Sequence, residues 1–480
     1  MKIRTYQLGS LNLKVSPFLH ANGELLRAVN VERDTIGAWK KRRGYVTYLG
    51  TPDNAQVTTL FSWRQNDDTT LLTYRKSGGT LYYSTAGTGS WTIAGNGTLT
   101  AASHVGHTVL DNILILGDGT AATRHSIGTL VGAGGGGTAF TATSGAPLAE
   151  HFTQYQGRVW AARGTSVTGT NTDMFYSTTG TATDWTTDSS SIRIPGSGRV
   201  NALFKSNDRL VATKDLGQMY RYDGFNLVDL ATDLGPTSAY SIGNVEDFRL
   251  YLNRRGVFGY GGNRPEIVSN PIQRQIYNNN GSAIAGTVFD NAPGVVHNYD
   301  YFASVGTVTD DLTNETIADC VLKYDYQLNE WVNWKFANRP YAFHSFKDRN
   351  GDQQLIFGDN GGQCYQLSGT ATTDNGNTIE SVLEGVLHFG APESEKKFNH
   401  IWAFTNPGCQ AKIQVAVADT FTKSKLNWVD LKATGDGITE CKFPQGFQGK
   451  LLFWKLYEAS RNAPWNFHGF TVDVDIEDKK

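Results

Sequence analysis

The chain has 480 residues, of which 39% are hydrophobic and 18% are charged, and its 43 basic and 45 acidic side chains give a net charge of −2. This length exceeds what one small core needs, and it indicates two or more domains or one large repeat array. The near-neutral charge argues against a dedicated nucleic-acid binder, which carries a basic excess, but it is compatible with a channel through which DNA merely passes.

The residue types favour β-structure. The chain has 53 glycines, 24 Phe, 21 Tyr and 11 Trp, which favour strands and tight turns over helices. Four cysteines lie tens of residues apart without a C-x-x-C pair, so we expect buried, reduced thiols and neither a zinc nor a redox site. No signal-peptide core and no run of about 18 apolar residues is present, so we expect no membrane-spanning helix and synthesis in a cytoplasm.

The first 50 residues contain a short apolar alternation and the chain's one dense basic cluster. Leu11–Val15 is predicted as a strand. Further on, Lys40, Lys41, Arg42 and Arg43 stand in a row before Gly44. Four consecutive cations either meet phosphate or an acidic partner surface, or form a solvated turn. We treat these four residues as candidate assembly or DNA-contact residues.

Residues 51–375 repeat a short apolar run, a turn and another apolar run. Leu81–Thr88 and Met174–Thr181 share the order apolar, aromatic, Tyr-Ser-Thr, a variable residue and Gly-Thr, and a Trp follows each. Looser copies stand at Gln218–Gly224, Leu322–Tyr326 and Gln363–Gly369. A spacing of roughly 35 to 50 residues with four short strands in each unit is typical of a propeller blade.

The predicted fold class is therefore all-β, with a β-propeller of six to eight blades, about seven, over residues 51–375. A blade cannot bury both faces alone, so closure of the ring supplies the core. The N-terminal segment, residues 1–50, is expected to close the propeller through Leu11–Val15 and to contact neighbours. Thr370–Asn377 is interpreted as a linker. Residues 376–480 alternate apolar and polar residues over longer runs and predict an additional C-terminal β-sandwich-like domain.

Four local patterns suggest chemistry, but each has a structural interpretation that we favour. Gly132–Gly137 lacks the Lys of a phosphate-binding loop and predicts a flexible loop. Asp348–Asp352 resembles a calcium loop without its glutamate ligand, so a hairpin turn is expected. His104 and His107 are three residues apart, whereas metal ligands on a strand are two apart, so they predict no metal site. Asp310–Asp311 predicts a solvated loop tip rather than an acid/base pair.

The two Tyr-Ser-Thr copies faintly resemble the Asp-box of sialidase propellers, with Ala86 and Thr179 in place of the Asp. That box is a structural turn. A sialidase also needs an arginine cluster, a Tyr–Glu pair and an acidic residue, and no local pattern marks them. We therefore predict no enzyme activity and no catalytic, cofactor-binding or metal-binding residues.

The order of several short motifs resembles one protein family. The first 50 residues run through Leu11–Leu13, Asn22–Leu25, Ala28–Val31 and Gly37–Tyr45. This order resembles the opening of the bacteriophage tail nozzle and tail hub family of short-tailed phages, which is similar to phage-stabilisation proteins and tail tubular protein B. The family's Arg-Pro-Gly pattern lacks its Pro here. Further matches follow at Pro265–Ile272, Phe389–Phe398, Gly449–Trp454 and Phe467–Phe470.

The resemblance spans nearly the whole chain, and it implies a structural virion protein. Such proteins form the nozzle or hub ring of a phage tail, usually a homohexamer, below the portal and the adaptor. The ring continues the DNA ejection channel and anchors fibres, spikes, a needle or a plug. The implied partners are these tail proteins, further copies of the chain, and genomic DNA in transit. The implied location is the virion tail, after assembly in the host cytoplasm.

Two alternatives stay open from the sequence. The first is a receptor- or glycan-binding propeller of a tail or baseplate, which would show a patch of exposed Trp and Tyr at one propeller face. The second is a sialidase-like glycosidase, which would show two carboxylates about 5 to 9 Å apart in a cleft.

Overall fold

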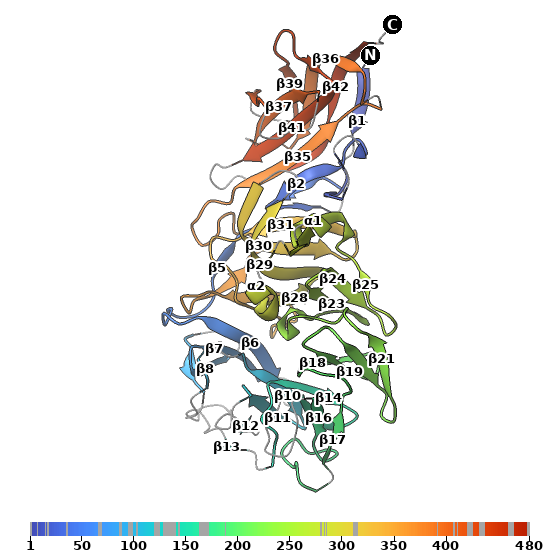
Figure 1. Ribbon diagram of the computed structural model, residues 1–480. Helices are drawn as coiled ribbons and strands as arrows, with labels where there is room; N and C mark the ends of the chain where they lie inside the picture. The colour runs from blue at the N-terminus through green and yellow to red at the C-terminus, as the bar shows by residue number, and fades with distance from the viewer. Residues whose placement is uncertain are drawn as a thin grey trace.

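In the computed structural model, a β-propeller and a β-sandwich follow one another along an elongated molecule (Figure 1). The structure describes residues 2–6, 8–14, 16, 19–34, 37–65, 70–85, 89–94, 99–101, 104–119, 125–127, 141–142, 145–162, 172–187, 189–278, 281–282, 284, 286–310, 315–390, 392–406, 409, 411–419, 426–431, 437–458 and 465–477. Among these residues, no helix is long and apolar enough to cross a membrane.

Seven antiparallel groups of four strands form the blades of the propeller within the described residues. Six of these groups are separate sheets, and blade 6 is part of a larger nine-stranded sheet. In blades 1 to 4 the strands follow one another along the chain. Blade 1 consists of β6 (Val57–Arg64), β7 (Leu71–Ser77), β8 (Thr80–Thr85) and β9 (Thr92–Ile93), and blade 2 of β10 (Gly106–Leu110), β11 (Ile113–Gly117), β12 (His125–Ile127) and β13 (Thr141–Ala142). Blade 3 consists of β14 (His151–Tyr155), β15 (Arg158–Ala162), β16 (Asp173–Tyr176) and β17 (Ser190–Arg193), and blade 4 of β18 (Val200–Ser206), β19 (Arg209–Lys214), β20 (Met219–Tyr222) and β21 (Leu227–Ala231).

Short helices separate the later blades. Blade 5 consists of β22 (Gly243–Val245), β23 (Phe248–Asn253), β24 (Gly256–Tyr260) and β25 (Glu266–Ile267), and blade 6 of β28 (Gly294–His297), β29 (Asp300–Asp310), β30 (Glu315–Asp325) and β31 (Glu330–Lys335). Blade 7 consists of β32 (Ala342–Lys347), β33 (Gln353–Gly358), β34 (Cys364–Leu367) and β5 (Tyr45–Thr47). The connecting elements are η2 (Ala239–Ser241), η3 (Asn270–Ile272), α1 (Gln273–Ile276), β26 (Tyr277–Asn278), β27 (Gly281–Ser282) and α2 (Gly286–Asn291).

The repeated sequence motif has one structural position. Each of its five copies overlaps the third strand of a blade, in β8, β16, β20, β30 and β34. Third strands are hydrogen-bonded on both edges, which suits alternating aromatic and β-branched side chains. The repeat therefore predicted the blades correctly, and their number lies within the predicted range.

The ring closes through β5 and not through the strand predicted at Leu11–Val15. β5 pairs antiparallel with β34, in the register Tyr45↔Leu367 and Thr47↔Tyr365, and supplies the fourth strand of blade 7. First strands of neighbouring blades contact one another at β10–β14, β14–β18, β22–β28 and β28–β32, and β32 of blade 7 contacts β6 of blade 1. Leu11 instead forms an isolated bridge to Leu25, and the Leu13 amide donates to the Pro271 carbonyl at 2.7 Å. The prediction for Leu11–Val15 is therefore wrong, because β2 and Pro271 take up the backbone groups of Leu11–Leu13.

The sandwich combines strands from both ends of the chain. One sheet contains β2 (Leu25–Val29), β35 (Ser381–Leu387), β41 (Leu451–Glu458), β37 (Lys412–Ala418) and β38 (Val429–Asp430). The other contains β3 (Val31–Arg33), β4 (Trp39–Lys41), β42 (Asn466–Glu477), β36 (Glu395–Thr405) and β39 (Ile438–Lys442), with β1 (Lys2–Tyr6) paired to β42 and β40 (Gln448–Gly449) paired to β36. The segment 1–50 therefore contributes β1 to β4 to the sandwich, and only β5 to the propeller.

The propeller and the sandwich share a sheet and a core. β2 pairs with β31 of blade 6 on one edge and with β35 of the sandwich on the other, so one nine-stranded sheet crosses the junction (Figure 1). A single hydrophobic cluster also runs from blades 5 to 7 into the sandwich, and includes Leu250, Phe302, Trp334, Val382 and Phe470. Such continuous burial is typical of one rigid unit rather than of two domains joined by a flexible linker.

Candidate functional site

A small cavity lies on the propeller axis. It has a volume of about 240 Å³, and residues at or near the first strand of each blade line it. Blades 1 to 3 contribute Thr58, His104 and Glu150, and later blades contribute Tyr240, Pro293 and Tyr341 among others. A cavity of this size is smaller than the range of about 300 to 1,000 Å³ that is usual for drug-sized ligands.

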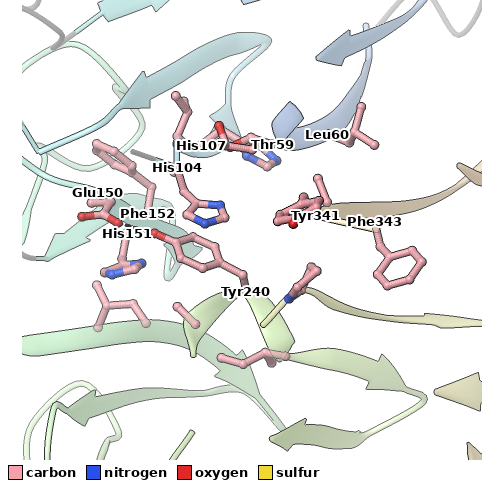
Figure 2. Close-up of a pocket in the computed structure, with 18 residues that line it drawn as sticks. Thr59, Leu60, His104, His107, Glu150, His151, Phe152, Tyr240, Tyr341 and Phe343 are labelled. Atoms are coloured by element: carbon pink, nitrogen blue, oxygen red, sulfur yellow. Dashed lines mark hydrogen bonds between the residues drawn. The ribbon is translucent and has the colours of Figure 1, made fainter. Parts of the chain in front are cut away.

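Tyr240, His104 and Glu150 form the polar centre of this cavity (Figure 2). The Tyr240 hydroxyl donates a hydrogen bond to Glu150 Oε1, and the His104 ring stacks on the Tyr240 ring at a centroid distance of 3.6 Å. The His151 ring lies 6.1 Å from the same tyrosine. His104 and Glu150 are both buried. The hydroxyl of Tyr240 is therefore held against the carboxylate of Glu150, in a cavity lined by aromatic rings.

Four histidines on or beside the inner strands are held neutral at physiological pH. The pKa of His104 is lowered to about 4, mainly by burial and to a smaller extent by Lys76 and His151, while Glu150 and a backbone hydrogen bond with Thr58 oppose the shift. Burial lowers the pKa of His107 and of His297 to about 4, and that of His344 to about 3. Two of these rings contact residues of blade 1. His107 stacks on Phe61 at a centroid distance of 4.0 Å, and His344 Nε2 lies 2.9 Å from Ser62 Oγ.

The cavity has one of the features that a glycosidase needs. A phenol hydrogen-bonded to a carboxylate is one way to activate a tyrosine nucleophile. Among the described lining residues, however, Glu150 is the sole carboxylate, and neither Arg nor Lys is present. A two-carboxylate mechanism would need a second acid at this site. No three His, Cys, Asp or Glu side chains in the described part of the chain are grouped so that they hold a metal ion.

Two of the four predicted contact residues are buried inside the fold. Lys41 forms an ion pair with the equally buried Glu458 of the sandwich. Arg42 is 1% exposed and donates to both carboxylate oxygens of Asp374, at 2.8 and 2.6 Å. It also donates to Asn30 Oδ1 at 2.8 Å and to the Lys335 carbonyl at 2.6 Å. Carboxylates of this chain thus neutralise Lys41 and Arg42, and the prediction of surface contacts does not hold for these two.

Lys40 and Arg43 keep exposed surface. Lys40 Nζ lies 3.2 Å from Glu32 Oε1 at a half-exposed site, and Arg43 is exposed. Alternation along β4 accounts only for the contrast between half-exposed Lys40 and buried Lys41, because β4 ends at Lys41. Arg42 lies beyond the strand and is buried by its hydrogen bonds to Asn30, Lys335 and Asp374. Contact with DNA or with a neighbouring subunit stays a prediction for these two residues.

The other motifs fall into structural roles. Asp348 Oδ1 accepts from the Asn350 and Asp352 amides, and Gly351 has φ +88°, so this segment is the predicted hairpin turn, between β32 and β33. All four cysteines are buried and lie outside any disulfide, as predicted. Gly132–Gly137, Ala86 and Asp311 lie outside the described residues, and Asp310 ends β29.

The tryptophans pack inside the molecule. All 11 lie in the described residues, and none is in the exposed class. Trp331 and Trp334 of blade 6 and Trp454 and Trp465 of the sandwich are buried in the large core cluster. The aromatic content therefore serves packing, as expected of strands, and tryptophan forms no open platform on a propeller face.

Sequence reasoning missed Glu150, His151 and Tyr240. Glu150 and His151 are 90 positions or nearly so from Tyr240 and belong to no motif, but each of the three stands just before or at the first strand of its blade. His104 has the equivalent place before β10. Aligning the repeats on their first strands, instead of on the third strand that carries the Tyr-Ser-Thr motif, is the signal that would have grouped them.

Comparison with known proteins identifies no family for this chain. No protein-family profile matches the chain, and no curated protein matches it in sequence. Solved structures that it resembles include BamB from Moraxella catarrhalis, at 10% identity and TM-score 0.38 over 76% of this chain and 97% of that one. They also include the N-terminal part of BBS1 in complex with ARL6, at 10% identity and TM-score 0.43 over 69% and 99%. The WD40 propeller of Doa1 has 10% identity and TM-score 0.30 over 68% and 97%.

The order of the strands in the sheets defines the class of the protein, an all-β chain with a β-propeller. Likeness at this level of identity carries no information about partners or activity.

Proposed function

We propose that the chain is a structural subunit of the tail of a short-tailed bacteriophage, where copies form the nozzle or hub ring below the portal and the adaptor. The order and spacing of the motifs from Leu11 to Tyr45 and in the last hundred residues support this proposal. In it, the subunit acts mechanically, as a stiff piece of the channel wall. Lys40 and Arg43 are candidate contacts in that wall.

One structural observation carries the proposal furthest. The nine-stranded sheet and the Arg42–Asp374 pair join the propeller to the sandwich without a flexible linker. A wall that withstands the passage of packaged DNA needs subunits that do not bend between domains. At the closure of the propeller, β5 covers the edge of β34, and the outer edge of blade 7 is then only three residues long.

The DNA path in this proposal runs between subunits and not through a propeller. The axial cavity of about 240 Å³ is far too small for a duplex, whose major groove alone is about 12 Å wide. A ring of identical copies encloses a wider lumen, and closed rings form through heterologous contacts. Near-neutral net charge suits such a lumen, because strong phosphate contacts would hold DNA in place.

The test is electron microscopy of intact particles that contain this chain, labelled with an antibody against it. Label on the tail axis, with about six copies per particle, is the expected result. Label on peripheral fibres, or no association with particles, overturns the proposal.

A second candidate function rests on the axial cavity, as part of a receptor- or glycan-binding propeller. Aromatic walls and the Tyr240–Glu150 pair are the kind of surface that packs against a sugar and hydrogen-bonds its hydroxyls. A glycan array with the native protein and with Tyr240→Phe tests it. Binding that the variant loses supports the candidate, and an array without signal removes it. Turnover of a fluorogenic glycoside panel would instead favour the glycosidase.

A further inference from the structure

An exposed phenylalanine projects from one turn of blade 4. Phe225 lies between β20 and β21 and is 92% exposed, more than any other large apolar side chain among the described residues. Burial of a phenylalanine side chain is favourable, so an exposed ring at the tip of a turn would be stabilised by a partner surface that removes it from water. Isolated exposed apolar residues are common, and the case for a docking role depends on what surrounds this one.

The turn holds Phe225 in a fixed position. Asp223 Oδ1 accepts from the amides of Phe225 and Asn226, at 2.9 and 2.7 Å. The Tyr222 hydroxyl donates to the Gly224 carbonyl at 2.6 Å, and Gly224 has φ +102°, which suits glycine. The amides of Asn226 and Phe225 lower the pKa of Asp223, so its carboxylate stays charged. A pre-ordered side chain loses little conformational entropy on docking.

A pocket that fits such a ring lies between blades 4 and 5. Its volume is about 420 Å³, and Leu234, Phe258, Ile267 and Tyr277 form its apolar surface. Tyr277 is 48% exposed, whereas Phe258 is buried in the core between the two blades. At the rim, the Arg255 side chain is 59% exposed and pairs with Asp233 at 2.8 Å.

The ring and the pocket lie at opposite ends of the propeller. In a four-stranded antiparallel blade, the turn between strands three and four lies at the end opposite the turn between strands two and three. Phe225 is in the first kind of turn, in blade 4, and Arg255 is in the second kind, in blade 5. The Asn207 side chain donates to the Gly261 carbonyl at 3.0 Å, which aligns the two blades in this sense. Phe225 therefore cannot reach the pocket of its own chain.

We infer that Phe225 of one copy docks into the pocket of Leu234, Phe258, Ile267 and Tyr277 on a second copy of this chain. The contact joins unlike surfaces, so it is heterologous and generates a ring or a filament rather than a closed pair. Docking brings the carboxylate of Asp223 to the rim that carries the exposed Arg255–Asp233 pair, where the guanidinium of Arg255 has further N–H groups to donate to it. The inference rests on the proposed ring and names the contact that builds it.

Cysteine trapping tests this contact directly. Phe225→Cys and Tyr277→Cys are made as two separate proteins, mixed, and exposed to a mild oxidant. The native cysteines are buried, so they give little background. We expect a covalent dimer in the mixture at a yield at least fivefold above that of either variant alone.

Leu328→Cys replaces Phe225→Cys in the matched control. Leu328 is 47% exposed and lies in the turn between strands three and four of blade 6, where Asp325 Oδ1 accepts the Leu328 amide at 2.9 Å. Its turn therefore has the same build and lies at the same end of the propeller. Equal trapping of Leu328→Cys and Phe225→Cys with Tyr277→Cys, or no trapping at either, overturns the inference.

Sedimentation velocity separates failure of the contact from failure of the ring. Phe225→Ala and Arg255→Gln are expected to weaken self-association of the native chain at least tenfold, with an unchanged melting temperature. Rings that assemble normally from Phe225→Ala overturn the docking contact and leave the proposed function in place. Absence of the chain from the tail axis of particles overturns the proposed function, whatever the trapping result.

Discussion

Arg42 joins three parts of the chain that are distant in sequence. Its guanidinium contacts Asn30, Lys335 and Asp374, and lies over the Phe336 ring at 4.8 Å. The planar fork of arginine suits this site, because two parallel N–H groups meet the two carboxylate oxygens. Buried pairs of this kind are expensive to break, since the remaining charge has no water to solvate it.

The first prediction concerns the partner of Arg42. Asp374→Asn leaves a buried cation without its counter-ion, and we expect it to lower the free energy of unfolding by about 3 to 5 kcal/mol. Urea titration followed by tryptophan fluorescence measures it. The control is Asp215→Asn, which breaks the exposed Arg199–Asp215 pair and costs less than about 1 kcal/mol. Equal midpoints for the two variants would contradict the role of Arg42.

The second prediction concerns pH. The histidines at positions 104, 107, 297 and 344 have folded pKa values of about 3 to 4, below the unfolded value of about 6.5. Between these values the unfolded chain binds more protons, so stability falls as the pH drops from about 6.5 to about 4. Burial raises the pKa of Asp300 to about 6 and that of Glu330 above its usual value. These two carboxylates stabilise the fold as the pH drops, but the four histidines outnumber them, so we expect the net stability to fall.

Thermal unfolding at intervals from pH 8 to pH 4 measures this dependence. His344→Gln keeps a hydrogen-bonding group beside Ser62 and removes one titration. We expect it to reduce the slope of stability against pH by up to about 1.4 kcal/mol per pH unit within that window. A melting temperature that is flat between pH 7 and pH 4.5 in the native protein would refute the prediction.

At this scale the sequence marks residue types but not their partners. The run Lys40–Arg43 is visible, but alternation along a strand would place Lys41 and Arg42 on opposite faces, whereas both are buried. The carboxylate that meets Arg42 lies 332 positions away, inside a stretch that is interpreted from its composition as a linker. Glu150 and Tyr240, 90 positions apart, meet only because the ring closes. Long-range pairs like these have no local signal.

Strand β5 is a short element with a large structural role. Its three residues close the propeller, and Tyr45 is fully buried against the rings of Phe336, Phe357 and Tyr365, at centroid distances of 5.4, 4.9 and 5.1 Å. The Tyr45 hydroxyl accepts the Asn338 amide at 2.9 Å. A strand of three residues contributes few ladder hydrogen bonds, so side-chain burial secures the closure.

The third prediction is that Tyr45→Ala opens blade 7. Loss of a buried aromatic ring costs about 3 to 5 kcal/mol, and the fourth strand of the blade loses its anchor. Hydrogen exchange detected by mass spectrometry should show faster exchange in β34, which pairs with β5. Tyr45→Phe is the control, because it keeps the ring and loses about 1 to 2 kcal/mol with the hydroxyl. Unchanged protection of β34 in Tyr45→Ala would contradict the closure.

Elements with a repeated pattern are predictable, and closing elements are not. The Tyr-Ser-Thr motif located third strands because aromatic and β-branched residues suit a position paired on both edges. β5 carries no such pattern, and Leu11–Val15 shows clearer alternation than Tyr45–Thr47. The choice between them depends on which strand reaches the free edge of β34, and that follows from the path of β2 to β4 through the sandwich.

The propeller and the sandwich are joined at a narrow junction next to β2. Asn30 lies at its centre with φ +54°, a left-handed conformation that asparagine tolerates better than most residues. Its side chain donates to the Glu380 carbonyl at 2.6 Å and accepts from Arg42 Nε and the Lys335 amide, at 2.8 and 2.7 Å. The Asn30 side chain thus connects the basic segment, blade 6 and the start of β35 in the sandwich.

The last prediction follows from this coupling. Chains of this size usually unfold in several steps, but a shared sheet and a continuous core should make the native protein unfold in one calorimetric transition. Asn30→Ala removes three hydrogen bonds from a buried site and places alanine at positive φ, which together cost on the order of 3 kcal/mol. We expect its transition to split into two, because the sandwich and the propeller then unfold separately.

Asn54→Ala separates the junction from the backbone conformation. Asn54 also has a left-handed φ of +59°, but it lies in an exposed turn before blade 1. Alanine there carries the same backbone strain and should lower the melting temperature slightly while the single transition is kept. One transition in Asn30→Ala would show that contacts other than those of Asn30 couple the propeller to the sandwich. Two transitions in the native protein would show that the two parts unfold separately. A subunit that is not one rigid unit would then be a poor wall for a DNA channel, and the glycan-binding alternative would gain support.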